Sequence, residues 1–79
     1  MNISYCKQAK KALERLDTTT KCRIRQGIDE LPAGDVKRLK GYTDLYRLRV
    51  GTWRVLFTMI AKNILIEDVL PRGDAYKEV

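Results

Sequence analysis

Three arginines, Arg47, Arg49 and Arg54, lie close together in a stretch whose alternating polar and apolar residues predict two β-strands. The predicted strands cover residues 45–50 and 53–60. A guanidinium group stays protonated and can donate two parallel hydrogen bonds to the oxygens of a phosphate. Arginines gathered on one surface therefore predict a site for a phosphate-bearing ligand, and the pairing of the two strands decides whether they gather.

The turn between the two predicted strands sets their register. Glycine at the first of two loop positions, here Gly51 followed by Thr52, is typical of a type II′ hairpin turn. With that turn Arg49 faces Arg54 directly, and Arg47 shares their face because side chains alternate along a strand. A slip of one residue would bury these arginines, so we expect a firmly held register. The opposite face receives six side chains that are expected to pack against helices: Tyr46, Leu48, Val50, Trp53, Val55 and Phe57.

The clustering of like charges has a cost in stability. Two arginines directly opposite each other on paired strands, as expected for Arg49 and Arg54, destabilise the pair by about 0.2–1 kcal/mol. A sheet built only for stability would not favour this arrangement, whereas a sheet that receives an anion would. A solvated basic face without a specific ligand is the alternative, because charged outer faces are ordinary on antiparallel sheets.

Two helices are predicted before the hairpin. Apolar residues at helical spacing indicate a first helix over residues 6–16 and a second over residues 19–31. Residues 17–20 break the pattern and offer several N-caps, and residues 32–34, Pro-Ala-Gly, end the second helix. Since only one short connection separates the two helices, we expect an antiparallel helix hairpin.

Further extended segments flank these helices and follow the hairpin. Residues 3–5 and the basic residues 36–40 are candidate short strands, and residues 64–70 are a predicted strand after a turn. In a regular strand, Ile64, Ile66 and Asp68 would point to the same face of the sheet. An aspartate does not suit a face that packs on the core. A β-bulge near residues 67–68 would resolve the conflict.

Helices first and strands afterwards predict an α+β fold. We expect the N-terminal antiparallel helix hairpin to pack on one face of a small, mainly antiparallel sheet of three to four strands. The other sheet face is then open to solvent or to a ligand. The chain has 79 residues, so we expect residues 1–79 to form a single domain. Its net charge of +6 indicates a polyanionic partner, either nucleic acid or an acidic protein.

Composition argues against several other classes of protein. Cys6 and Cys22 are too few for a disulfide scaffold, and without histidine they predict neither a zinc site nor a Cys–His catalytic pair. We therefore expect no metal and no other cofactor. No apolar run is long enough to span a bilayer, and residues 1–5 lack the apolar segment of a signal peptide. We expect a cytoplasmic protein without a membrane partner.

Several short segments occur in an order that is known from one protein family. They are AKKAL at 9–13, LP at 31–32, LKG at 39–41, LYRLRVGTWRV at 45–55 and PRGDAYK at 71–77. In these segments and their spacing, over nearly the whole chain, the sequence resembles the RelE/ParE superfamily of bacterial toxins from type II toxin–antitoxin systems. The resemblance implies a fold of two N-terminal helices on a small antiparallel sheet, and a cognate antitoxin as partner.

The resemblance also implies an activity. RelE-like members cleave messenger RNA on the ribosome without metal, whereas ParE-like members poison DNA gyrase. The sheet and tail of this chain carry basic and aromatic residues where the RelE branch has them, which favours the endonuclease. The catalytic residues implied in this way are Arg47, Arg49, Arg54, Arg72 and Tyr76.

The implied reaction is attack of a ribose 2′-OH on the adjacent phosphate, giving a 2′,3′-cyclic phosphate and a 5′-OH. Arg54 and Arg72 are candidates for stabilising the negative charge of the transition state. Tyr76 is a candidate base, acid or stacking platform. Glu67 and Asp68 are further candidate proton acceptors, although a purely structural role is the simpler interpretation.

Two positions depart from the family pattern. Leu45 stands where the best-known RelE enzymes carry a lysine, and Pro71 stands where several relatives carry histidine. The identity of the general base is therefore open. A gyrase inhibitor, and a degenerate toxin that acts only as the antitoxin-binding co-repressor, remain the alternatives.

A second set of basic residues is expected on the outer face of the first helix, together with one lysine at the end of the basic segment 36–40. Through phosphate contacts these residues would hold RNA, including ribosomal RNA, without reading its sequence. A solvated helix face is again the alternative. The candidate RNA-binding residues are Lys7, Lys10, Lys11, Arg15 and Lys40.

Overall fold

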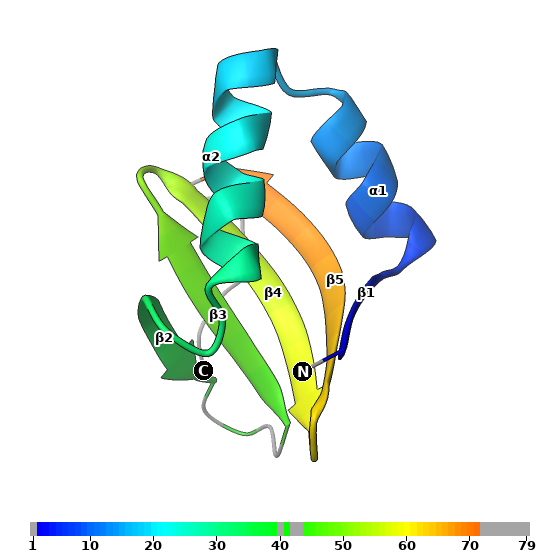
Figure 1. Ribbon diagram of the computed structural model, residues 1–79, viewed down its shortest axis with the longest axis vertical. Helices are drawn as coiled ribbons and strands as arrows, with labels where there is room; N and C mark the ends of the chain where they lie inside the picture. Colours follow the sequence, from blue (N-terminus) through cyan, green and yellow to red (C-terminus); the bar gives the residue numbers. More distant parts are fainter. Residues whose placement is uncertain (1, 40, 42–43, 72–79) are drawn as a thin grey trace.

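The computed structural model describes residues 2–39, 41 and 44–71 and places two helices on one face of a five-stranded sheet (Figure 1). The spatial order of the strands is β1-β5-β4-β3-β2. β1 pairs with β5 in parallel, and the other neighbouring strands are antiparallel. The elements are β1 (Asn2–Tyr5), α1 (Lys7–Glu14), α2 (Thr18–Asp29), β2 (Asp35–Arg38), β3 (Leu45–Val50), β4 (Trp53–Ile60) and β5 (Asn63–Pro71).

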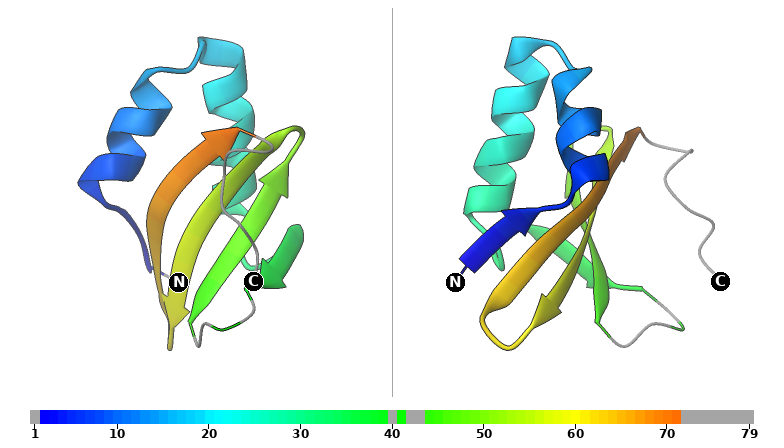
Figure 2. Two further views of the ribbon diagram at one scale, coloured as in Figure 1. Left: turned by 180° about the vertical axis from the view of Figure 1, so that it is seen from behind. Right: turned by 90° about the vertical axis from the view of Figure 1, so that its right-hand side faces the viewer.

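The α+β fold with both helices on one sheet face is confirmed (Figure 2). The expected number of three to four strands is wrong, because both short segments, β1 and β2, pair with the edges of the central three strands. The expected packing of the two helices as a hairpin is not exact either. α1 packs on β5 and α2 on β3, and these strands lie on opposite sides of β4, so the helices are spread across the sheet.

Local chemistry explains how α2 begins and how closely it approaches the sheet. Asp17 is its N-cap and accepts a hydrogen bond from the Thr20 amide at 3.1 Å, which satisfies one of the free amides of the first turn. A Cβ atom on Gly27 would lie 3.0 Å from Cγ2 of Val50, so the absence of a side chain lets α2 lie close to β3. Among the described residues, no helix is long and apolar enough to cross a membrane.

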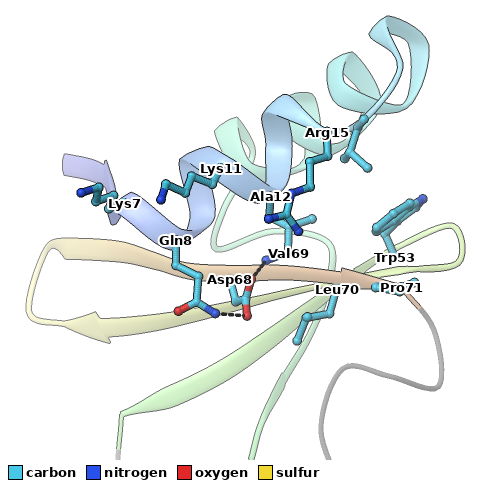
Figure 3. A pocket seen from close by; sticks show the side chains of 11 residues that line it. Lys7, Gln8, Lys11, Ala12, Arg15, Trp53, Asp68, Val69, Leu70 and Pro71 are labelled. Atoms are coloured by element: carbon cyan, nitrogen blue, oxygen red, sulfur yellow. Dashed lines mark hydrogen bonds between the residues drawn. The ribbon is translucent and has the colours of Figure 1, made fainter.

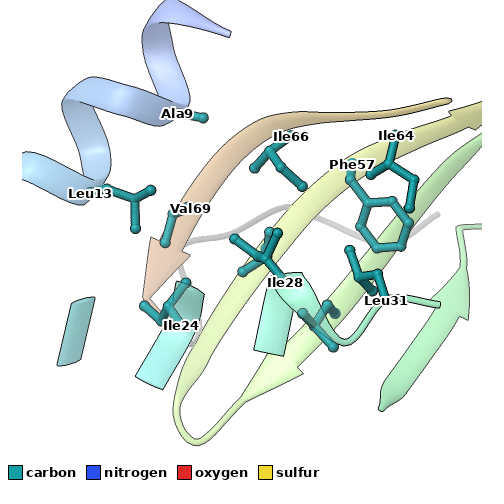
Figure 4. Close-up of a cluster of buried hydrophobic side chains, with 11 residues drawn as sticks. Ala9, Leu13, Ile24, Ile28, Leu31, Phe57, Ile64, Ile66 and Val69 are labelled. Carbon is teal, nitrogen blue, oxygen red and sulfur yellow. The ribbon is translucent and has the colours of Figure 1, made fainter. Parts of the chain in front are cut away.

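The hydrophobic core lies between the two helices and the inner sheet face (Figure 4). Phe57 is completely buried and stacks on Tyr46, its partner across β3 and β4, with ring centroids 5.5 Å apart. Trp53 also packs against this core, as expected, but it is only half-buried because it lies at the end of the sheet. The buried side chains of this core are Ala9, Leu13, Ile24, Ile28, Leu31, Leu48, Val55, Phe57, Ile64, Ile66 and Val69.

The predicted register of the β3–β4 hairpin is confirmed, with Arg49 opposite Arg54 and Val50 opposite Trp53. Gly51 has a φ of +60°, whereas Thr52 is not among the residues with positive φ, which together define the expected type II′ turn. Glycine adopts a positive φ at little steric cost, which suits the first position of this turn.

The predicted bulge in the last strand is also present. Leu56 pairs with Asp68, but the next residue of β4, Phe57, pairs with Ile66, so Glu67 is the extra residue. The bulge reverses the alternation of β5. As a result Ile66 and Val69 both face the core, and Asp68 lies on the open face.

Candidate functional site

The open face of the sheet carries most of its charged side chains in two rows that cross the strands. The first row is Asp35, Arg49, Arg54 and Leu70, and the second is Lys37, Arg47, Leu56 and Asp68. Neighbouring strands are about 4.8 Å apart, so side chains that adjoin within a row are within contact range. We call Arg47, Arg49 and Arg54 the arginine cluster.

Asp35, the first residue of β2, holds two members of the arginine cluster with one carboxylate. Its Oδ2 accepts a hydrogen bond from Nε of Arg49 at 2.8 Å. Arg47 Nη1 lies 3.4 Å from Asp35 Oδ1 and donates to the Asp35 backbone carbonyl at 3.2 Å. The Arg47 side chain is 14% exposed and that of Arg49 51%, so Arg47 is fixed against the sheet while Arg49 remains accessible.

The acidity of Asp35 reflects these contacts. Partial desolvation would raise the pKa of its carboxyl, but the hydrogen bond and charge of Arg49, followed by those of Arg47, lower it, and the net pKa lies below the ordinary value. The carboxylate is therefore ionised at neutral pH. Because a strongly acidic group is a weak proton acceptor, Asp35 is suited to orienting the two guanidinium groups rather than to general base catalysis.

Arg54, the third member of the arginine cluster, is not held in the same way. Its Nη1 is buried, and within the part of the chain that the structure describes it has no hydrogen-bond acceptor. An unpaired buried donor on a charged group is costly, and its retention is explained if a ligand supplies the acceptor. Unlike Arg47 and Arg49, Arg54 has no bond to the Asp35 carboxylate.

The sequence-predicted residues divide into three groups. Arg47, Arg49 and Arg54 are brought together as expected. Arg72, Tyr76 and Lys40 lie outside the described residues. The cations of α1 are separated, because Lys10 lies with Tyr5 and Arg25 between the two helices, away from the other three: Lys7, Lys11 and Arg15.

Lys7, Lys11 and Arg15 line a groove of about 660 Å³ between α1 and the outer edge of β5. Figure 3 shows the three cations following one another along α1, with Trp53 beside Pro71 at the end nearest Arg15. Gln8 closes the other end by donating to Oδ2 of Asp68 at 2.7 Å.

A second hollow, of about 670 Å³, lies on the open face next to the arginine cluster. Its lining includes three carboxylates, those of Asp44, Glu67 and Asp68. Glu67 accepts a hydrogen bond from Thr58 Oγ1 at 3.3 Å, and Asp68 is bound by Gln8 and by the Val69 amide. In residues 2–39, 41 and 44–71, no three Cys, Asp or Glu side chains are grouped so as to hold a metal ion.

Asp35 was not among the site residues predicted from the sequence. The residue stands directly before the short basic segment that was a candidate strand, and its significance depends on the pairing of β2 with β3, which places Asp35 opposite Arg49. The available signal was an acidic residue at the start of an otherwise basic strand.

Comparison with known proteins shows which class has this architecture. No family model matches the sequence. The chain is 29% identical to Toxin RelE3 of Methanocaldococcus jannaschii over 84 aligned positions, which cover 96% of each protein. The crystal structure of the archaeal RelE–RelB complex from Pyrococcus horikoshii OT3 contains a chain that is 32% identical, with a TM-score of 0.75; the match covers 94% of this chain and 97% of that one.

A third similarity is to the RelB–RelE antitoxin–toxin complex from Methanococcus jannaschii, at 27% identity and a TM-score of 0.74, covering 85% of this chain and 87% of that one. Two helices on one face of a mostly antiparallel sheet are thus the architecture of a class of toxins from toxin–antitoxin systems. The chain belongs to the RelE family of these toxins.

Proposed function

We propose that the protein is the toxin of a type II toxin–antitoxin system and acts as a ribosome-dependent, metal-independent messenger-RNA endonuclease. The observation that carries the proposal is the arginine cluster, in which the half-exposed Arg49 lies directly opposite Arg54 on the open sheet face. A backbone phosphate offers the acceptor oxygens that neighbouring guanidinium groups can bind. Such an action on the ribosome takes place in the cytoplasm.

The proposed reaction is attack of a ribose 2′-OH on the neighbouring phosphate, which breaks the bond to the 5′ oxygen and leaves a 2′,3′-cyclic phosphate and a 5′-OH. Arg54 and Arg49 lie side by side and would stabilise the charge that develops on the phosphate oxygens. Asp35 would keep Arg47 and Arg49 in place before the RNA arrives, so that less order has to be imposed during the reaction.

Residues of the C-terminal segment complete the proposed site. Arg72 would add a cation at the phosphate, and Tyr76 would transfer a proton or stack on a base. The depressed pKa of Asp35 makes that residue a poor substitute as the base. Tyr76 is therefore the first position at which to test proton transfer.

Two kinds of partner follow from the proposal. RelE-family chains are found in complexes with RelB in the related structures, and we propose a cognate antitoxin for this chain as well. An acidic segment of such a partner would complement a chain with a net charge of +6. Messenger RNA on the ribosome is the proposed substrate, and Lys7, Lys10, Lys11, Arg15 and Lys40 are the proposed RNA contacts.

The test is induced expression in bacterial cells of the wild type, Arg54→Ala and the control Lys62→Ala. Lys62 is an exposed cation in the turn between β4 and β5. We expect the wild type and Lys62→Ala to arrest growth and to produce cleaved transcripts in primer extension. Arg54→Ala should lose about 10²-fold or more in cleavage, the size of effect known for removal of one transition-state donor.

The same experiment separates the alternatives. Growth arrest with intact transcripts and an induced DNA-damage response would contradict the endonuclease and identify a gyrase inhibitor. Absence of any effect on growth, from a protein that is present and folded, would identify a degenerate toxin that serves only as an antitoxin-binding co-repressor.

A further inference from the structure

The groove between α1 and β5 has a regular charge pattern that the arginine cluster does not use. Lys7, Lys11 and Arg15 are four residues apart and so lie on one side of α1. Successive members are separated by about 6 Å along the helix axis, since each residue rises 1.5 Å. Lys10, which belongs to the same helix, lies on its other side.

The floor of the groove combines apolar surface with one aromatic side chain. Ala12 lines it from α1 and Leu16 from just after this helix, and Leu70 and Pro71 line it from β5. Trp53 stands at the end of the row of cations, half-buried against the core yet part of the groove wall (Figure 3). A row of cations that ends at an aromatic platform is typical of surfaces that bind single-stranded nucleic acid.

The edge of β5 argues against an added peptide strand as the occupant. β1 pairs with β5 only as far as Ile66, which leaves the groove side of the following residues without a strand in the described part of the chain. That edge is blunted, because the Val69 amide already donates to Oδ1 of Asp68 at 2.8 Å and Pro71 has no N–H to offer. A pairing strand would thus find few free donors there.

The groove adjoins the arginine cluster. Leu70 lines the groove and is the register partner of Arg54 in the neighbouring strand. The two sites are therefore separated by the width of one strand, about 4.8 Å. A single nucleic acid strand can occupy both by passing over the edge of β5.

We propose that this groove binds the messenger-RNA strand beyond the arginine cluster, with backbone phosphates on Lys7, Lys11 and Arg15 and one base stacked on Trp53. The inference rests on the proposed function in its choice of messenger RNA. It adds a subsite for a flanking nucleotide and assigns Trp53 a role in binding as well as in packing.

Trp53 is the single tryptophan of the chain and reports on the groove directly. We expect hexauridylate to quench its fluorescence on titration into the purified full-length protein. Three phosphate contacts predict a salt dependence of log K on log salt with a slope of about −2, from roughly −0.7 per contact for single strands. Lys11→Ala should weaken binding and reduce the slope by about one contact, whereas the control Lys62→Ala, which removes an exposed cation outside the groove, should change neither.

The stacking contribution is measured with labelled oligonucleotides by fluorescence anisotropy. Trp53→Leu keeps an apolar side chain against the core and removes the aromatic face, and it should weaken hexauridylate binding about tenfold or more. Circular dichroism checks that this variant is folded. The comparison of Lys62→Ala with Lys11→Ala tests the groove independently of Trp53.

A double variant, Arg49→Ala with Arg54→Ala, separates the groove from the catalytic proposal. It should still bind hexauridylate with quenching, while losing the extra affinity that dodecauridylate gains by reaching the arginine cluster. Equal effects of Lys62→Ala and Lys11→Ala, or no quenching, would overturn the groove site. Quenching by hexaglutamate with equal affinity would identify an acidic peptide as the occupant instead, and no gain for dodecauridylate would overturn the continuity with the arginine cluster.

Discussion

Asp35 and Arg49 face each other across β2 and β3, and Oδ2 of the carboxylate lies 2.8 Å from Nε of the guanidinium. The same carboxylate lies 3.4 Å from Nη1 of Arg47. One acidic residue therefore partly neutralises and orients two of the three arginines that form the proposed phosphate site. The third, Arg54, is left with a free buried donor among the described residues.

The first prediction separates binding from catalysis at Asp35. Asp35→Asn removes one negative charge beside the arginine cluster, so RNA binding should become tighter and more salt-dependent. The neutral amide no longer holds Arg47 and Arg49 firmly, so cleavage should fall by roughly tenfold or more through lost positioning. Anisotropy and single-turnover cleavage on programmed ribosomes measure the two effects. A parallel loss of both would show that Asp35 acts through the fold alone.

A second prediction concerns acid stability. A carboxyl whose pKa is lowered by folding stabilises the folded state above its unfolded pKa, about 4 for aspartate, and the contribution disappears as pH falls through the folded value. The wild type should therefore have a higher melting temperature than Asp35→Asn at neutral pH, and the difference should shrink in acid. Thermal unfolding of both proteins from pH 7 to pH 2 measures it, and a difference that stays constant would contradict this account of the ion pair.

The third prediction is a trade of stability for function at Arg54. Arg54→Met keeps a long apolar stem but removes the unpaired buried donor and the like charge opposite Arg49. We expect the variant to be more stable by about 1 kcal/mol, which for a domain of this size raises the melting temperature by roughly 4–8 °C. Growth arrest on expression should be lost. A destabilised variant would mean that the guanidinium is satisfied in the native protein.

A fourth prediction tests the close approach of α2 to β3. Alanine is about 0.5–1 kcal/mol better than glycine inside a helix, but at Gly27 its Cβ would meet Cγ2 of Val50 at 3.0 Å. Gly27→Ala should therefore raise the free energy of unfolding by this full amount only in the Val50→Ala background, because Cγ2 of Val50 is then absent. Denaturant unfolding of the four proteins of this double-mutant cycle measures the coupling, and purely additive effects would contradict the contact.

Much of the sheet followed from local pattern. Gly51 and Thr52 define a two-residue turn, and alternation along the strands then places Arg49 opposite Arg54 and Phe57 opposite Tyr46 without further information. Regular alternation in β5 would place Asp68 on the same face as Ile64 and Ile66, and this conflict likewise predicted the bulge at Glu67. These features are local, because the chain segments involved are neighbours in the sequence.

Features that depend on distant pairing were beyond such reasoning. β1 and its partner residues in β5, Asn63–Ile66, lie at opposite ends of the described chain. The residues of the short segment 3–5 do not indicate that it pairs in parallel with its partner strand. The separation of Lys10 from Lys11 required knowing which side of α1 faces α2 and which faces the edge of β5. The role of Asp35 required the pairing of β2.

The sequence by itself determined the α+β class, the register of the β3–β4 hairpin and the shared face of Arg47, Arg49 and Arg54, because these follow from turn chemistry and side-chain alternation. The tertiary structure alone decided that Asp35 binds two of these arginines and that α1 and β5 enclose a basic groove ending at Trp53. Such contacts join elements far apart in the chain, and their geometry is set by packing of the core rather than by any local preference.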